Sequence, residues 1–334
     1  MVKTLVKISV GKLRGIQELS SPDGFLMMIA MDQRGSLAKM LNSTNPDSVG
    51  YEQMEDVKVD LSRILAPHGT AVLHDPEFGV SQSITRFALP GNVGLLVAVE
   101  TTGYKGGSTS RLTEIVENWG VEKVKRMGAS AVKLLLYYRP DEKESAEHQR
   151  KLARRIGDEC SKYDIPFVLE PMSYALKGED KSSPQFADSK PKIVIQTAKE
   201  LTPLGVDILK SEFPGDLKFH RDPDELTKWC KEISDATCVP WVVLSAGVGY
   251  EEFRENVIYS CKGGCSGYLA GRAIWQEAVR MPSREERIKF LEETSVPRLK
   301  ELQQIVRANA RPWYDFYGGM DKIEVTRKGW HKEY

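Results

Sequence analysis

The sequence predicts an α/β protein: a single (β/α)8 barrel, with a core at about residues 20–280 and a C-terminal extension at about 284–334. Eight short apolar runs recur along the chain, and most are separated by a segment long enough for a helix. Each run is almost continuously apolar, which is typical of parallel strands covered on both faces. The length of 334 residues is ordinary for one barrel, and no linker divides residues 1–334 into two domains.

The predicted strands follow one another along the whole core. They cover residues 25–31, 70–74, 94–99, 131–136, 166–170, 206–210, 241–245 and 267–270. Amphipathic segments predict helices at 51–66, 111–127, 145–162, 190–203, 223–236 and 250–262. The stretch between the second and third strands is short and irregular, and its helical pattern is the weakest.

Several helices are marked by their first residues. Asp222 precedes Pro223 and offers an N-cap, and Ser283 with Glu286 has the spacing of a capping box. From about residue 284 we expect a long helix, and then an extension rich in aromatic residues and glycine.

Composition excludes several classes of protein. Lysine plus arginine and aspartate plus glutamate both number 47, so the formal net charge is zero and no nucleic-acid partner is indicated. The five cysteines are scattered, which favours free thiols over a disulfide framework or a zinc site. No apolar run approaches the roughly 20 residues of a membrane span, and the first residues lack a signal-peptide pattern. We expect a cytoplasmic homo-oligomer that has no membrane partner.

Two lysines sit where barrel strands should end. Lys210 closes the run at 205–210, and Lys133 lies within the run at 131–136. Burial disfavours a charged ammonium, and two neighbouring lysines should lower each other's pKa. A neutral lysine amine is a nucleophile that forms Schiff bases with ketones, so the sequence favours Schiff-base chemistry without cofactor or metal.

Other strand ends supply groups that fit this chemistry, since barrel active sites lie at the carboxyl ends of the strands. Asp32 and Glu170 are candidates to move protons, if burial raises a carboxyl pKa toward neutrality. The turn Gly271-Arg272 and the hydroxyl of Ser245 match the place where barrels hold a phosphate group.

Structural interpretations of the same residues compete with the functional ones. Lys210 could pair with Glu212 and Asp32 with Arg34, and Glu170 could simply end a strand before Pro171. A metal-dependent barrel enzyme is one rival hypothesis, and its candidate ligands are His74, Asp75, Glu77 and His220. A non-catalytic sensor of sugar phosphates and a lysine-dependent aldolase of non-phosphorylated acids are two further rivals.

An ordered set of motifs resembles the class I tagatose 1,6-bisphosphate aldolase family over roughly residues 20–280. The motifs are MDQRGSL at 31–37, AVK at 131–133, LKSE at 209–212, LSAGV at 244–248 and AGRAIW at 270–275. The resemblance implies that Lys210 forms the Schiff base and Glu170 is the acid/base, while Asp32 and Lys133 assist proton transfers. It also implies that four residues hold the substrate 1-phosphate: Ser245, Gly247, Gly271 and Arg272. The reaction would yield dihydroxyacetone phosphate and an aldehyde.

The distal end of the substrate stays open at this stage. A similar aldolase that cleaves 6-deoxy-6-sulfofructose 1-phosphate shares much of this core, and the C4 configuration is not determined by these motifs. Candidates to bind the distal group are Gln33, Arg34, Lys105, Arg111 and Arg139. Loops 102–108 and 177–184 are candidate lids. For the C-terminal segment an ordered surface tail or a subunit contact is the favoured interpretation, and Tyr334 as a proton shuttle is the lesser hypothesis.

Overall fold

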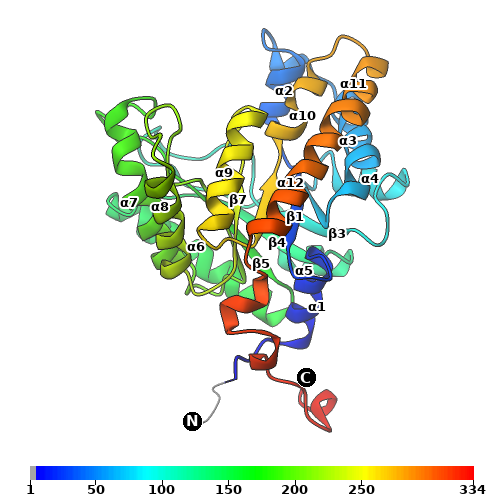
Figure 1. The fold of residues 1–334 in the computed structure, drawn as a ribbon. Coiled ribbons are helices and arrows are strands. Elements are labelled where there is room, and N and C mark those ends of the chain that lie inside the picture. Colours follow the sequence, from blue (N-terminus) through cyan, green and yellow to red (C-terminus); the bar gives the residue numbers. More distant parts are fainter. Residues whose placement is uncertain (1–4) are drawn as a thin grey trace.

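The computed structural model describes residues 5–334, in which eight parallel strands close into one barrel in the order β1 to β8 (Figure 1). The strands are β1 (Leu26–Ala30), β2 (Ala71–His74), β3 (Gly94–Ala98), β4 (Ala131–Tyr137), β5 (Phe167–Met172), β6 (Ile208–Ser211), β7 (Trp241–Leu244) and β8 (Gly267–Ala270). The barrel closes where β1 pairs with β8, with Met28 opposite Leu269. All eight predicted strands are confirmed, and so is the barrel.

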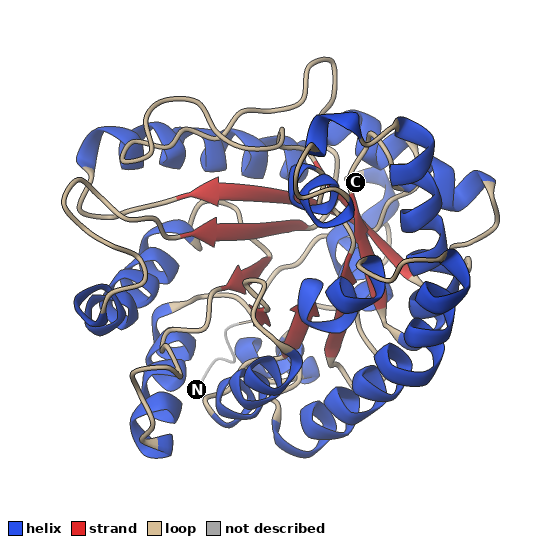
Figure 2. Cartoon of the chain, turned by 90° about the horizontal axis from the view of Figure 1, so that it is seen from above, coloured by secondary structure: helices blue, strands red, loops and turns tan. Residues whose placement is uncertain are grey.

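Helices surround the strands, as the view down the barrel shows (Figure 2). They are α1 (Val10–Leu19), α2 (Gly35–Leu41), α3 (Tyr51–Leu65), α4 (Val80–Thr85), α5 (Val121–Arg126), α6 (Lys143–Lys162), α7 (Pro184–Leu201), α8 (Pro223–Ala236), α9 (Tyr250–Lys262), α10 (Arg272–Val279), α11 (Arg284–Phe290) and α12 (Val296–Asn309). Short 3-10 turns make up most of the remaining helical structure.

The predicted helix at 111–127 is wrong for its first ten residues. Only α5 is helical there, and the preceding segment pairs with the chain after β3 through antiparallel bridges Lys105–Leu112 and Glu100–Ile115. Pairing in the tertiary structure therefore overrides the amphipathic pattern. Helix α7 begins at Pro184, earlier than the predicted 190, because the Ser183 side chain caps it by accepting from the Phe186 N–H.

The predicted long C-terminal helix is confirmed in two parts. The capping box of Ser283 and Glu286 starts α11, and a π-helical turn at Leu291–Ser295 joins α11 to α12. The sequence pattern did not predict α1 or α2, and α2 begins immediately beyond the end of β1.

The interior of the barrel is apolar at one end and polar at the other. Side chains along a strand alternate between the two faces. In β4, Ala131 joins the buried cluster inside the barrel, so Lys133 points inward two residues later. By the same alternation Val168 precedes Glu170 in β5, and Ile208 precedes Lys210 in β6. The inward polar residues thus lie one layer nearer the carboxyl ends of the strands.

The amino ends of the strands are closed by α1 and by the C-terminal extension. Ile16 and Leu19 of α1 are fully buried against the interior cluster, which Trp313 of the C-terminal extension also joins. The Trp313 N–H donates to the Gly24 carbonyl at 2.9 Å. Helix α1 and the C-terminal extension lie below the barrel in Figure 1, on the side opposite α2 and α10.

The hypothesis that Tyr334 shuttles protons is wrong for this structure. Its hydroxyl donates to the carboxylate of Asp164, which lies just before β5 at the amino end of the barrel. The tail therefore contacts the barrel at the end opposite the inward lysines.

Two further observations concern the described residues as a whole. The five cysteines are free, as predicted, and four of them are buried. No helix within residues 5–334 combines the length and apolar character that crossing a membrane requires.

Trp313→Ala should destabilise the protein, because it removes a buried aromatic ring from the closure of the barrel. We expect a loss of about 3–5 kcal/mol in the free energy of unfolding, measured by urea titration. Tyr334→Phe is the control: its ring is exposed, and its loss of one surface hydrogen bond should change stability by less than about 0.5 kcal/mol. Equal stability of the two variants would contradict the role given to Trp313.

Candidate active site

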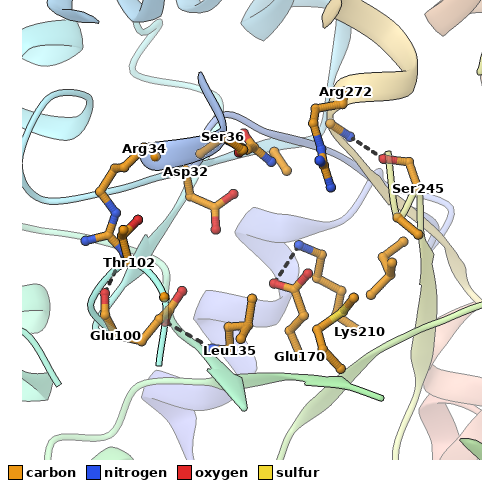
Figure 3. Close-up of a pocket in the computed structure, with 18 of the residues that line it drawn as sticks. Asp32, Arg34, Ser36, Glu100, Thr102, Leu135, Glu170, Lys210, Ser245 and Arg272 are labelled. Carbon is orange, nitrogen blue, oxygen red and sulfur yellow. Dashed lines mark hydrogen bonds and ion pairs between the residues drawn. The ribbon is translucent and has the colours of Figure 1, made fainter. Parts of the chain in front are cut away.

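A cavity of about 510 Å³ opens at the carboxyl ends of the strands. Its wall takes residues from the ends of β1 and β3 to β8 and from α2. Figure 3 shows Asp32, Glu170, Lys210, Ser245 and Arg272 facing the same space. The residues predicted from separate strand ends thus come together.

Lys133 lies beneath the cavity and holds three carboxylates. Its Nζ is 2.8 Å from Asp32 Oδ2, 2.5 Å from Glu100 Oε1 and 2.9 Å from Glu170 Oε2. Complete burial alone would lower the pKa of Lys133, but the three carboxylates outweigh burial and raise it well above the ordinary value. The expectation of a lowered pKa is therefore wrong for Lys133, whose raised pKa keeps the ammonium charged at neutral pH.

Lys210 differs from Lys133 in its access to the cavity. It lines the wall, and its Nζ lies 2.9 Å from Glu170 Oε2 (Figure 3). The alternative pairing with Glu212 does not form: that carboxylate accepts from the Ser173 N–H at 2.7 Å and lies 3.6 Å from Lys181. Of the two inward lysines, only Lys210 lines the cavity, where a bound molecule could reach it.

Asp32 is held in its charged form. Burial would raise the pKa of its carboxyl, but Lys133 and then Lys210 lower it well below the ordinary value. The expected elevation of the pKa is thus wrong for Asp32. The alternative ion pair with Arg34 is also absent, because Arg34 binds Glu77 Oε1 and the Glu100 carbonyl, each at 2.6 Å.

The ends of β7 and β8 form an electropositive corner of the cavity. Ser245 Oγ accepts from the Gly271 N–H at 3.3 Å, and Arg272 begins α10 immediately afterwards. Gly247 has φ of 83°, and a Cβ there would lie 2.7 Å from the Arg272 Cζ. Glycine therefore lets the guanidinium rest against the backbone. Within residues 5–334 Arg272 has no recorded ion-pair partner, which leaves its charge available to an anion.

The five candidates for the distal group have different surroundings. Gln33 and Arg34 line the cavity, although the Arg34 guanidinium is already paired. Lys105, Arg111 and Arg139 lie outside the lining. Lys105 pairs with Glu114, and Arg111 stacks over the rings of three tyrosines. Arg139 is buried between Asp141 and Glu179. It also donates to the Tyr174 carbonyl and so stabilises the loop after β5.

The sequence analysis gave no role to three residues that line the cavity or contact its neighbours. Glu100 follows β3, and its place at a strand end was a usable signal. Lys39 lines the cavity from α2, a helix that the sequence pattern did not predict. Lys58 is fully buried in α3; it pairs with Asp75 and donates to the Met31 carbonyl at 2.7 Å, next to Asp32.

The residues of the metal-ligand hypothesis are engaged elsewhere. His74 Nε2 bonds with Ser62 Oγ at 2.9 Å, and burial, then Lys58, lower the pKa of His74 to about 4. Asp75 and Glu77 pair with Lys58 and Arg34, and His220 with Asp188. In the described part of the chain, no three His, Cys, Asp or Glu side chains form a group suited to a metal ion.

The two candidate lids also differ. Thr102 and Gly103 of the first loop line the cavity. The loop at 177–184 does not, and it is anchored by Glu179 on Arg139 and by Lys181 Nζ on the Ser173 carbonyl at 2.9 Å.

Known proteins resemble this chain along most of its length. A tagatose 1,6-diphosphate aldolase 2 from Streptococcus agalactiae is 34% identical over 319 residues, which cover 90% of this chain and 97% of that protein. A tagatose 1,6-diphosphate aldolase 1 from Enterococcus faecalis is 35% identical over 320 residues, which cover 91% of this chain and 97% of that protein.

Similarity of fold extends further than similarity of sequence. The fructose-bisphosphate aldolase of Plasmodium falciparum superposes with a TM-score of 0.69 at 14% identity, covering 93% of this chain and 99% of that one. The family model of DeoC/LacD family aldolases matches residues 26–277, which include all eight strands and the whole cavity wall. This chain is therefore a member of the DeoC/LacD family of aldolases.

Proposed function

We propose that this aldolase is a class I enzyme that cleaves a ketohexose 1,6-bisphosphate, such as tagatose 1,6-bisphosphate, into dihydroxyacetone phosphate and glyceraldehyde 3-phosphate. The observation that carries the proposal is a lysine amine at the cavity wall, Lys210, with the Glu170 carboxylate 2.9 Å away. The names of the tagatose 1,6-diphosphate aldolases that resemble the chain support the choice of substrate.

The first stage is the formation of an iminium. The Lys210 amine adds to the C2 ketone and gives a carbinolamine, and loss of the C2 hydroxyl as water then leaves a C2=N⁺ bond. In this proposal Glu170, whose Oε2 lies 2.9 Å from Lys210 Nζ, takes the ammonium proton and returns a proton to the departing hydroxyl.

The second stage breaks the C3–C4 bond. A carboxylate, Glu170 in this proposal, accepts the proton of the C4 hydroxyl, and the C4 aldehyde forms as the bonding electrons move toward the iminium. The remaining enamine is protonated at C3, and water adds to the iminium to release dihydroxyacetone phosphate and the free lysine.

Lys133 and Asp32 have supporting roles in this proposal. As a cation at neutral pH, Lys133 orients Asp32 and Glu170 and limits the repulsion between them. Because its pKa is lowered, Asp32 stays ionised at neutral pH and can accept a hydrogen bond from a substrate hydroxyl rather than supply a proton. Arg272, Ser245 and the Gly271 backbone, supported by Gly247, are proposed to hold the 1-phosphate.

We also propose that the chain is a single domain and works as a cytoplasmic homo-oligomer, in keeping with a soluble metabolic aldolase. Light scattering coupled to size-exclusion chromatography tests the oligomeric state, and a monomer at working concentration would contradict it. One cooperative unfolding transition, followed by two spectroscopic probes, is the outcome expected of a single domain.

Borohydride reduction in the presence of dihydroxyacetone phosphate should attach the substrate carbon to the peptide that contains Lys210. Lys210→Met should abolish the adduct and lower kcat on the order of 10⁴-fold or more, because it removes the nucleophile. Peptide mass spectrometry locates the adduct. Attachment at Lys133 would reverse the roles of the two lysines, and a wild-type enzyme that forms no adduct would contradict class I chemistry.

Lys133→Met should destabilise the protein in a manner that depends on pH. In the wild type, the pKa of Lys133 is raised by folding, so its contribution to stability is fully present below about pH 10. The pKa of Asp32 is lowered by folding, so its contribution is fully present above about pH 4. Both contributions are therefore complete at pH 7.5. Without the cation, burial opposes the ionised form of Asp32 and its strongest opposing interaction is gone, so the variant should lose stability as the pH rises from 5 to 7.5.

We expect Lys133→Met to cost about 3–5 kcal/mol at pH 7.5 and clearly less at pH 5, measured by urea unfolding. Lys199→Met, which removes an exposed lysine on α7, should leave stability nearly unchanged at both values. A pH-independent loss would show that Lys133 acts by packing alone.

A further inference from the structure

The cavity wall contains more positive charge than its own acids neutralise. Four cationic side chains line it: Arg34, Lys39, Lys210 and Arg272. Arg34 is paired with Glu77, and Lys210 with Glu170. Within residues 5–334, neither Lys39 nor Arg272 has a recorded ion pair or side-chain hydrogen bond. Paired cations stabilise the wall, whereas unpaired cations at the wall of a cavity are available to an anionic ligand.

The two unpaired cations reach the cavity from different elements. Arg272 follows β8 and lies beside Ser245 and Gly271, at the corner assigned above to the 1-phosphate. Lys39 lies in the last turn of α2, the helix that follows β1. Figure 1 shows α2 beside α10 above the barrel.

Helix α2 also adjoins the loop after β3. A Cβ on Gly35 would be 3.4 Å from the Thr102 Cγ2, which is ordinary van der Waals contact. Ser36 of α2 and Thr102 of the loop both line the cavity, and Ser36 precedes Lys39 by three residues, which puts the two on the same side of α2. Hydroxyl donors together with an ammonium are a suitable set for a tetrahedral oxyanion.

We propose that Lys39, with the hydroxyls of Ser36 and Thr102, binds the tetrahedral oxyanion at C6 of the substrate. This inference rests on the proposed function, since it assigns the second anionic end of the same ketose. With C2 bonded to Lys210 and the 1-phosphate beside Arg272, the C4–C6 fragment must lie along another part of the wall. The chemistry suits either a phosphate monoester or a sulfonate at C6.

The test compares Lys39→Met with wild type on substrates that differ only at the distal end. Tagatose 1,6-bisphosphate carries a C6 phosphate, and tagatose 1-phosphate carries an uncharged hydroxyl there. We expect kcat/KM for the bisphosphate to fall about 10- to 100-fold, the range for a lost charge-assisted hydrogen bond. The same constant for the 1-phosphate should not change.

Lys199→Met is the matched control, because it also removes an exposed lysine from the last turn of a helix, but outside the cavity. It should behave as wild type with both substrates. An equal loss for both substrates in Lys39→Met would assign Lys39 to the 1-phosphate or to folding, and no loss would leave it without a role. Either result overturns the inference.

Two fructose-series substrates distinguish a sulfonate from a phosphate at C6: 6-deoxy-6-sulfofructose 1-phosphate and fructose 1,6-bisphosphate share the same C4 configuration and differ only at C6. A Lys39-dependent preference for one C6 group over the other identifies the group that the wall accommodates.

Binding of inorganic phosphate tests Lys39 without any turnover. By calorimetry the wild type should bind two phosphate ions, and Lys39→Met one. If the wild type turned over none of these ketoses, the proposed function would be refuted, whereas the number of phosphate ions bound would still test the distal site. A single phosphate in both proteins would refute the distal site alone.

Discussion

The arrangement of the polar layer depends on one buried ammonium. Lys133 Nζ contacts carboxylates that follow or belong to three different strands: Asp32 after β1, Glu100 after β3 and Glu170 in β5. Without that cation three acids would share a space of low dielectric, where like charges repel strongly. Glu100 also accepts from the Leu135 N–H at 3.0 Å, which links the same cluster to the backbone of β4. The cluster therefore fixes both the charge state of Asp32 and the position of Glu170 beside Lys210.

The two ends of the barrel have different roles: the amino ends of the strands hold the apolar core, and the carboxyl ends hold the candidate active site. At the amino ends of the strands, α1 and Trp313 close an apolar interior. At the carboxyl ends, the next inward layer is charged and open to the cavity. This division follows from strand alternation, because Val168 and Glu170, or Ile208 and Lys210, face the same interior two residues apart.

Pairing, rather than residue type, distinguishes structural cations from candidate ligand-binding cations in this molecule. Arg139 is buried and bound on both sides by carboxylates, so it stabilises a loop. Arg34 lines the cavity but has its charge satisfied by Glu77. Arg272 rests against Gly247 and has no recorded acidic partner in the part of the chain that the structure describes. Desolvating a charge is costly, so a protein that leaves a cation unpaired at a cavity wall favours an anion there.

The sequence by itself determined the eight strands and the placement of Lys133, Glu170 and Lys210 at one end of the barrel, because apolar runs and alternation along a strand are local properties. Only the tertiary structure decided that Lys133 is the cation of a carboxylate cluster and that Asp32 is strongly acidic, because both depend on side chains far apart in sequence, such as Lys133 and Asp32, which are separated by 101 residues. It also replaced a predicted helix at 111–120 with bridged loop structure, and it brought Lys39 of the unpredicted α2 to the cavity. Such contacts are long-range, and no pattern within a single segment encodes them.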